Sequence, residues 1–314
     1  MSQAGAVLAN SADNPLAGAG FDRLYESQIK PELLKVEAVR AAAVRRFALF
    51  MGGGVALVVL ETLAAMMVSG DTQASADFRL TSLTLAVAAG LGYLSLRPLA
   101  ARLKRLVLEA ICPALGVTYG GAAPAIDLFQ RLNLLAIGEQ TGLGDQFAGQ
   151  RRGCDFAIGE VTMTRRSGKK QVPVFQGQLI EVAYPKPFLG VTVIQRDGGA
   201  TNRLMCPPGL KTVGLEDPRF ERIFEVFGSD QIESRVLLNP AMMEGLVRLE
   251  TATQGQYLRG AFTGGKLFIA VNRSDRFEIG SVFSPVVDQI RIAAIVRDLG
   301  VVMQLIDAFV ETAP

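Results

Sequence analysis

The main hydrophobic pattern in this chain is a pair of long apolar runs separated by a short polar loop. The first run extends from Phe47 to Val68 and contains one charged residue, Glu61. Its length of about 22 residues exceeds the roughly 20 that an α-helix needs to cross a bilayer. The second run, about 80–96, has no charge and is near the lower limit for a span. The pattern predicts a transmembrane hairpin, with two buried helices of a soluble core as the alternative.

Basic residues cluster at the outer ends of both runs. They are Lys35, Arg40, Arg45 and Arg46 before the first run, and Arg97, Arg102, Lys104 and Arg105 after the second. The connecting loop, 69–79, contains two aspartates and a single arginine. Because positive residues stay on the cytoplasmic side, we expect a multi-pass protein with both termini cytoplasmic. No small-residue cleavage site directly follows a short apolar core, so the first run is predicted to be a retained anchor rather than a signal peptide.

Small residues recur at similar depth when the two runs are aligned antiparallel by their centres. The candidate helix-packing positions are Gly52, Gly53, Gly54, Gly90 and Gly92. Glycine lets helix backbones approach closely in lipid, and such positions would also permit a homo-oligomer. The alternative is that these glycines only reflect the higher glycine content of membrane helices.

One ionisable residue lies inside the first run. Glu61 falls roughly opposite Thr84 in the same alignment, which makes the pair a candidate intramembrane polar site. The alternative is a protonated or threonine-bonded glutamate without a transport role, because two helices alone cannot build a proton path.

The residues outside the hairpin divide into three further parts. Residues 1–20 are rich in Ala, Gly, Ser and Asn and are predicted to be a disordered tail. Residues 21–46 have helical periodicity that continues into the first span, with Pro31 either breaking or starting the helix. Together with the hairpin they make a segment 21–105, and residues 106–314 are expected to form one cytoplasmic domain.

Within residues 106–314 the pattern alternates between strand and helix periods. Strands are predicted at 154–166, 171–184, 187–199, 256–263 and 266–273, and helices at 125–137 and 240–250, with two helical stretches in 284–309 that meet near Gly300. Residues 220–227 alternate as a strand does, with a helix as the alternative. Gly264 and Gly265 are a hairpin turn signal. Strands and helices do not alternate as βα units, so we expect an α+β fold with a mainly antiparallel sheet and C-terminal helices.

Composition removes most catalytic classes. The chain has no histidine, three scattered cysteines and a net charge of +2. Ser-His-Asp and Cys-His sets, His-containing metal sites and a four-cysteine site are therefore excluded. Phosphate-binding glycine motifs are missing, so no cofactor is predicted, and the near-neutral charge argues against nucleic-acid binding. Acid–base chemistry would have to use Asp, Glu, Lys or Tyr.

Several short segments with characteristic spacings follow one another between residues 106 and 309. They are Gly153, Asp155 and Gly159; Phe175, Gly177 and Leu179; Lys186, Phe188, Gly190, Thr192 and Val193; the segments 215–226 and 230–243; and Lys266 to Ala270. In order and spacing these segments resemble the bacterial family DUF3137. The resemblance implies a protein anchored in the bacterial inner membrane with a cytoplasmic α+β domain. It implies no activity, substrate or catalytic residue.

A polar cluster in this region has two interpretations. Asp217, Asp230, Gln231, Glu233 and Arg235 are candidates for a surface that docks a partner. They are alternatively structural, with the aspartates capping helices and Glu233 completing a capping box with Asp230.

Two functions remain open at this point. The first is a membrane-anchored interaction or scaffold protein whose domain recruits other proteins or senses lipid. The alternative is a membrane-tethered enzyme that uses Asp, Glu and Lys chemistry with a divalent metal. We favour the first because no catalytic set is present.

Overall fold

The computed structural model describes most of the chain, namely residues 19–69, 74–135, 138, 140–184, 188–197, 208–252, 258–272 and 281–311. The predicted tail up to residue 18, Lys186 and Cys206 lie outside these residues. The chain forms two compact units. The sheet unit comprises Met1–Asp22, Cys112–Phe277 and Ile292–Pro314, and the hairpin unit comprises Arg23–Ile111 and Glu278–Arg291.

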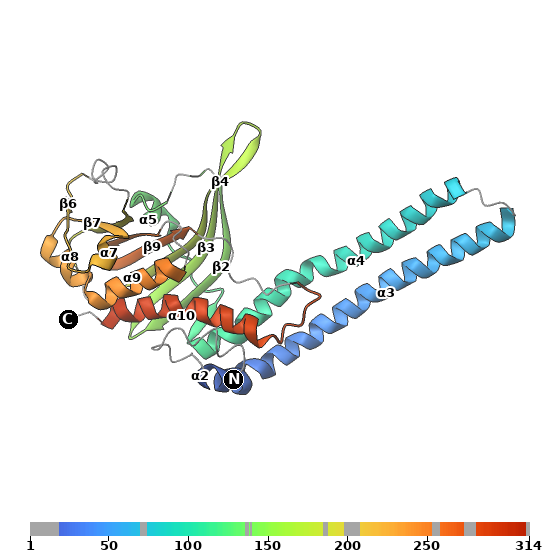
Figure 1. Cartoon of the computed structure of the whole chain (residues 1–314), viewed down its shortest axis with the longest axis horizontal. Helices are drawn as coiled ribbons and strands as arrows, with labels where there is room; N and C mark the ends of the chain where they lie inside the picture. Colours follow the sequence, from blue (N-terminus) through green and yellow to red (C-terminus); the bar gives the residue numbers. More distant parts are fainter. Residues whose placement is uncertain are drawn as a thin grey trace. The chain divides into compact units, whose positions relative to one another are not determined.

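Two long helices, α3 (Lys30–Ser69) and α4 (Ala74–Ile111), make up most of the hairpin unit. They run antiparallel and side by side (Figure 1), because successive contacts join later residues of α3 to earlier residues of α4. Helix α2 (Ala19–Leu24) and a π-helical turn, Tyr25–Ile29, precede α3 without a break. Pro31 therefore does not end the helix. The wider π turn, closed by the Lys30 N–H on the Tyr25 carbonyl, comes directly before the proline, whose ring would crowd a regular α turn.

The sheet unit contains a nine-stranded sheet among its described residues, in the order β1-β2-β3-β4-β9-β8-β5-β7-β6. Every neighbouring pair is antiparallel, as expected. The strands are β1 (Val117–Tyr119), β2 (Gln140–Arg151), β3 (Cys154–Ser167), β4 (Lys170–Ala183), β5 (Thr192–Arg196), β6 (Lys211–Thr212), β7 (Phe224–Gly228), β8 (Leu258–Thr263) and β9 (Lys266–Asn272). A 3₁₀ turn, Cys112–Leu115, leads into β1.

Glycine turn signals in the sequence correctly predicted two pairs of neighbouring strands, β3–β4 and β8–β9. Gly264 and Gly265 adopt positive φ angles of 58° and 71° between β8 and β9, as their hairpin signal predicts. The β3–β4 turn likewise includes Gly168 at φ 63°. By contrast, β2 was not predicted from its glycine-rich sequence. It pairs with β3 along nearly its whole length, with an irregularity between Leu143 and Gln146.

Three predictions of secondary structure need correction. The predicted helix 125–137 is limited to α5 (Ile126–Arg131), after which Asn133 takes a positive φ of 57° and turns the chain. The predicted strand 220–227 divides into α7 (Pro218–Glu221) and β7, because Asp217 caps a helical turn there. The two predicted C-terminal helices are one, α10 (Gln289–Glu311). It passes through Gly300 because apolar residues on both sides of the glycine are buried, which outweighs a cost of about 1 kcal/mol for an interior glycine.

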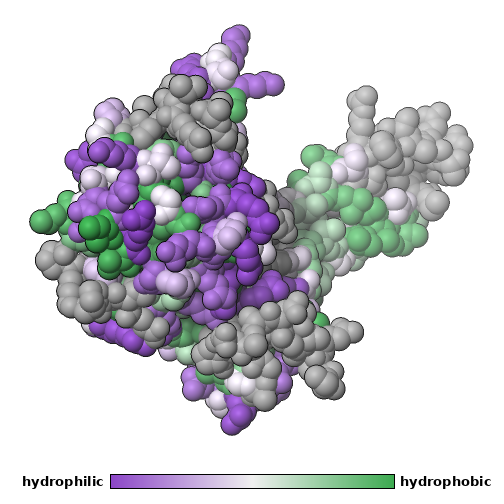
Figure 2. Space-filling view, turned by 60° about the vertical axis from the view of Figure 1, so that its left-hand side comes forward, coloured by the Kyte–Doolittle hydropathy of each residue, from purple (hydrophilic) through white to green (hydrophobic). Residues whose placement is uncertain are grey.

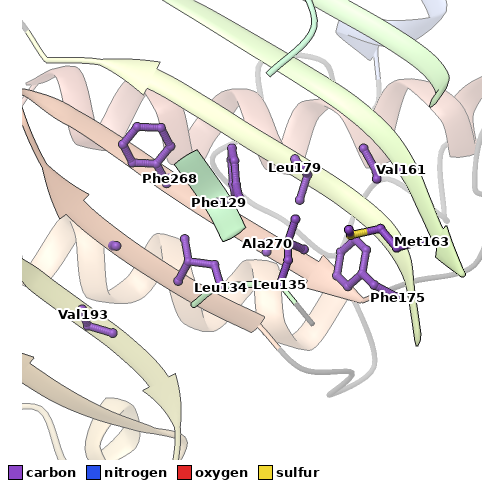
Figure 3. Packing of buried hydrophobic residues seen from close by; sticks show 11 residues of the cluster. Phe129, Leu134, Leu135, Val161, Met163, Phe175, Leu179, Val193, Phe268 and Ala270 are labelled. Atoms are coloured by element: carbon purple, nitrogen blue, oxygen red, sulfur yellow. The ribbon is translucent and has the colours of Figure 1, made fainter. Parts of the chain in front are cut away.

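Helices cover both faces of the sheet. On one face, the Phe129 ring of α5 meets Phe268 of β9 edge to face at 5.3 Å and lies in a cluster of apolar side chains from the central strands (Figure 3). On the other face, α10 brings Phe309 to 5.6 Å from Phe262. Helix α9 (Pro240–Ala252) packs beside α10, since a Cβ at Gly245 would come within 3.0 Å of Leu305. The short helix α8 (Gln231–Leu237) follows β7.

Candidate functional site

Large apolar side chains are exposed along both helices of the hairpin unit. On α3 they are Leu49, Phe50, Val55, Leu57, Val59, Leu60, Leu63 and Met67, and on α4 they are Leu83, Leu85, Val87, Leu91, Tyr93 and Leu94. Figure 2 shows this hydrophobic surface in green where the hairpin unit is described. Apolar surface of this extent marks an interaction with lipid or with protein.

One helix among the described residues is long and apolar enough to cross a membrane. It is the continuous helix Gly20–Ala64, whose apolar part is almost entirely exposed. On α4 the apolar stretch Ser82–Leu94 is shorter than a span. The structure therefore shows one candidate span, and a hairpin with two spans stays a prediction.

The structure brings Glu61 and Thr84 together. The Thr84 hydroxyl donates to Oε1 of Glu61 at 3.0 Å and lies 3.3 Å from Oε2. Both side chains are half-buried in the seam between α3 and α4. This hydrogen bond stabilises two partly buried polar side chains. It agrees with the alternative in which Glu61 is bonded to threonine and has a structural role. A transport role stays a prediction.

The five glycines of the hairpin differ in their packing. A Cβ at Gly54 would lie 2.5 Å from the Ala88 Cβ, and one at Gly92 would lie 2.8 Å from the Phe47 ring. These two glycines permit close approach of α3 and α4. At Gly52, Gly53 and Gly90 a Cβ would meet nothing within 4 Å among the described atoms. Two of the five predicted glycines therefore lie in the contact between α3 and α4, Gly54 opposite Ala88 and Gly92 opposite Phe47.

The five polar candidates near α8 make hydrogen bonds inside the sheet unit. Asp217 accepts from the Arg219 and Phe220 amides, and Asp230 accepts from the Ile232 and Glu233 amides at 2.8 and 3.1 Å. Each aspartate therefore caps a helix. Gln231 and Arg235 donate to the carbonyl oxygens of Thr212 and Gly214 at 3.4 and 3.2 Å. A docking role for these side chains stays a prediction, but each already has a structural partner.

Glu233 joins α8 to the start of β5. Its carboxylate oxygens accept from the Leu189 and Gly190 amides at 3.0 and 2.6 Å, instead of closing the expected capping box on the N-cap residue. Next to it, the Ser234 hydroxyl lies 2.8 Å from the Thr192 hydroxyl, and both side chains are buried. Two of the segments that resemble DUF3137, one with Gly190 and Thr192 and one with Glu233, thus contact each other.

Two apolar side chains of α8 are exposed beside the polar ones. Ile232 is 75% exposed and Val236 is 49% exposed, and their spacing of four places them on the same side of the helix. Leu189, whose amide is held by Glu233, is 97% exposed. Figure 2 shows that most of the visible face of the sheet unit is hydrophilic, with a small hydrophobic group within it. Sequence reasoning missed these residues because an apolar residue at helical spacing is normally assigned to the core.

A cavity of about 310 Å³ lies where β6 and β7 meet α7. Its lining includes three carboxylates, Asp197, Glu221 and Glu225, together with Phe224 and Val226. The Glu221 carboxylate accepts from the Leu215 amide at 2.8 Å. Over the part of the chain that the structure describes, no group of three Asp, Glu, Cys or His side chains is arranged to hold a metal ion.

An ion pair with a buried glutamate lies elsewhere in the sheet unit. Glu250 of α9 is 4% exposed and lies 3.1 Å from the Arg196 guanidinium of β5. Burial raises the pKa of the Glu250 carboxyl above its usual value, while the arginine partly opposes this change.

Comparison with known families decides the affiliation of the sheet unit. Residues 173–310 match the model of a family described as "Protein of unknown function (DUF3137)". This part of the chain is thus similar to the DUF3137 family. The match confirms the resemblance found in the sequence segments, and it contains both sides of the Glu233 contact. It begins within β4, so the segment around Asp155 lies before the DUF3137 region.

Comparisons beyond the family model add little. No curated protein matches the chain. A solved structure that matches is the crystal structure of the mycobacterial trehalose monomycolate transport factor A, TtfA, at 13% sequence identity and a TM-score of 0.35. The match covers 66% of this chain and 93% of that chain. At that TM-score the likeness supports no conclusion about function.

Proposed function

We propose that the α3–α4 hairpin crosses the bacterial inner membrane twice and anchors a cytoplasmic DUF3137 unit that binds other proteins. The observation that carries the anchoring is the exposed apolar surface on both helices. Each large apolar side chain that leaves water gains roughly 1.5–3 kcal/mol. A bilayer provides this gain along the apolar stretches of both helices.

The ends of the hairpin support the orientation. Arg45 and Arg46 on α3 and Arg102 and Arg105 on α4 are exposed next to the apolar stretches. Basic residues at the outer ends of both helices favour a topology in which both termini are cytoplasmic.

Membrane extraction and reporter fusions test this proposal. We expect the protein to stay in the membrane fraction after alkaline carbonate washing. We also expect a reporter that is active only in the periplasm to be active when inserted between α3 and α4 and inactive when fused after Pro314. Release by carbonate, or periplasmic activity at the C-terminus, would contradict the anchoring or the orientation.

The outward face of α8 supports the interaction role. Ile232 and Val236 expose apolar side chains, while the polar residues of the same helix make bonds within the unit. A protein partner would bury these two side chains and leave the internal bonds intact.

Site-specific photo-crosslinking in intact cells tests the interaction role. A photoreactive residue in place of Ile232 should give a discrete crosslinked product with another protein. The matched control is Glu244, which is also exposed but belongs to α9. Products at neither site, or equal products at both sites, would contradict a partner surface on α8.

The tethered enzyme is the weaker candidate. It would have to use the acidic cavity beside β7, where Glu221 already accepts a backbone hydrogen bond and where the described carboxylates form no metal-binding group of three. No observation favours this function over the interaction role.

A further inference from the structure

The segment that leads into α10 belongs to the hairpin unit and is held on α3. The Val286 amide donates to Oε2 of Glu37 at 2.9 Å, and Nη1 of Arg40 donates to the Val282 carbonyl at 3.1 Å. Both bonds join residues that are more than 240 positions apart in the sequence. We call residues 281–287 the interfacial segment.

The two α3 side chains that hold this segment also bind each other. Nε of Arg40 lies 3.0 Å from both carboxylate oxygens of Glu37. The Arg40 side chain is only 11% exposed and that of Glu37 only 22%. Charge-assisted bonds at a partly buried site are stronger and more specific in geometry than those of an exposed pair, so the interfacial segment has a defined position on α3.

Within the segment, Phe283 lies at the start of the apolar run of α3. Its ring packs edge to face on Phe47 with 5.4 Å between the ring centres. Phe47 is the first residue of that run, and its own position is set by close contact with Gly92 of α4. Despite this contact, Phe283 is 55% exposed.

The charges beside Phe283 suit the same level of a bilayer. Arg45 and Arg46 come directly before Phe47 and are exposed. Basic residues at the end of an apolar helix mark the level where hydrocarbon meets headgroups. An exposed phenyl ring at that level gains free energy by burying its apolar area in lipid.

We propose that Phe283 inserts at the membrane–water boundary beside Phe47, so that the interfacial segment is a third membrane contact made from a part of the chain remote from the hairpin. This proposal rests on the proposed anchoring. Arg45 and Arg46 bind lipid phosphates at this level, and the Glu37–Arg40 pair keeps Phe283 there.

The absence of tryptophan from the chain gives a direct test. The full chain with Phe283→Trp has a single tryptophan, which keeps an aromatic ring against Phe47. The protein is placed in vesicles of phosphatidylglycerol and phosphatidylcholine, in which the phosphatidylcholine is brominated near either the carbonyl end or the methyl end of its chains. We expect loss of emission mainly with bromine near the carbonyl end.

Two further single-tryptophan chains calibrate the measurement. Leu57→Trp, in the middle of the apolar run, should be quenched most by bromine near the methyl end. Ile232→Trp, on the exposed face of α8, should not be quenched. If Leu57→Trp is quenched and Phe283→Trp is not, the interfacial segment is not in lipid and the proposal is wrong, while the anchor stands. If Leu57→Trp is not quenched, the anchoring itself is wrong.

A second variant tests the role of the ion pair. Adding Arg40→Gln to the Phe283→Trp chain should release the interfacial segment and reduce the quenching. The matched control is Lys35→Gln, which removes an exposed cation from the same helix, where it pairs with exposed Glu32. Equal quenching in both double variants would show that Arg40 does not position Phe283.

Discussion

Glu233 gives the most direct test of how the sheet unit is held together. Its two carboxylate oxygens accept from the backbone amides of Leu189 and Gly190 at 3.0 and 2.6 Å. These bonds attach α8 to the start of β5. Glu233→Ala removes both acceptors and leaves the helix cap on Asp230 unchanged.

The magnitude follows from the burial of the two donors. A hydrogen bond to a charged group contributes roughly 1.5–3 kcal/mol when it is shielded from water. The Leu189 bond is exposed, so water replaces the lost acceptor at little cost, whereas the Gly190 bond is partly buried. We expect Glu233→Ala to lower the free energy of local opening by about 2 kcal/mol in total. Since 1.4 kcal/mol is a factor of ten, amide exchange should accelerate by about 30-fold.

Hydrogen exchange of the full-length protein in detergent measures this effect directly. The peptide that contains Leu189 and Gly190 should lose protection in Glu233→Ala. The control is Glu244→Ala, which removes an exposed partner of Arg248 four residues away. That pair is worth about 0.3–0.5 kcal/mol, so exchange should change by no more than about twofold, and only on α9.

Unchanged exchange at Leu189 and Gly190 in Glu233→Ala would refute the reasoning. It would mean that the carboxylate adds nothing to the connection between α8 and β5. Equal acceleration in Glu244→Ala would refute it as well, because the effect would then reflect loss of any glutamate from this unit.

Three further changes follow from the packing and the charges. Gly54→Ala should destabilise the hairpin by about 1–3 kcal/mol in thermal unfolding, because the new Cβ would have no room beside Ala88. Gly53→Ala is the control and should not destabilise it. Equal melting temperatures of the two variants would contradict the packing of Gly54. The pKa of Glu37 is lowered chiefly by its hydrogen bond to Arg40. The loss of stability caused by Glu37→Gln should therefore be full above pH 4.5 and shrink as the pH falls through the lowered pKa. A loss of stability that stays constant with pH would contradict this role of the Glu37 charge. Burial raises the pKa of the Glu250 carboxyl, so Glu250→Gln should increase stability above that raised pKa. The advantage should shrink as the pH falls through the raised pKa and be gone below 4.5, whereas an effect independent of pH would exclude this cause.

Features that depend on neighbouring residues were predictable from the sequence. The turns at Gly168 and Gly264 fix adjacent strands because the chain can reverse there only with positive φ angles. The apolar runs predict the long helices α3 and α4 for the same reason, since hydropathy acts over one segment at a time. The orientation that the basic flanks predict stays a prediction. The helix caps at Asp217 and Asp230 also involve only the next few residues.

Features that depend on distant residues were decided by the tertiary structure. Gly300 lies inside a continuous α10 because the sheet buries the helix on both sides of it, and β2 forms because β3 offers a complete edge. The positions of Glu233 against Gly190 and of Arg40 against Val282 follow from chain segments that meet only after folding. A pattern of apolar and polar residues shows which side chains avoid water, but the partner that covers them is chosen by the packing of the whole unit.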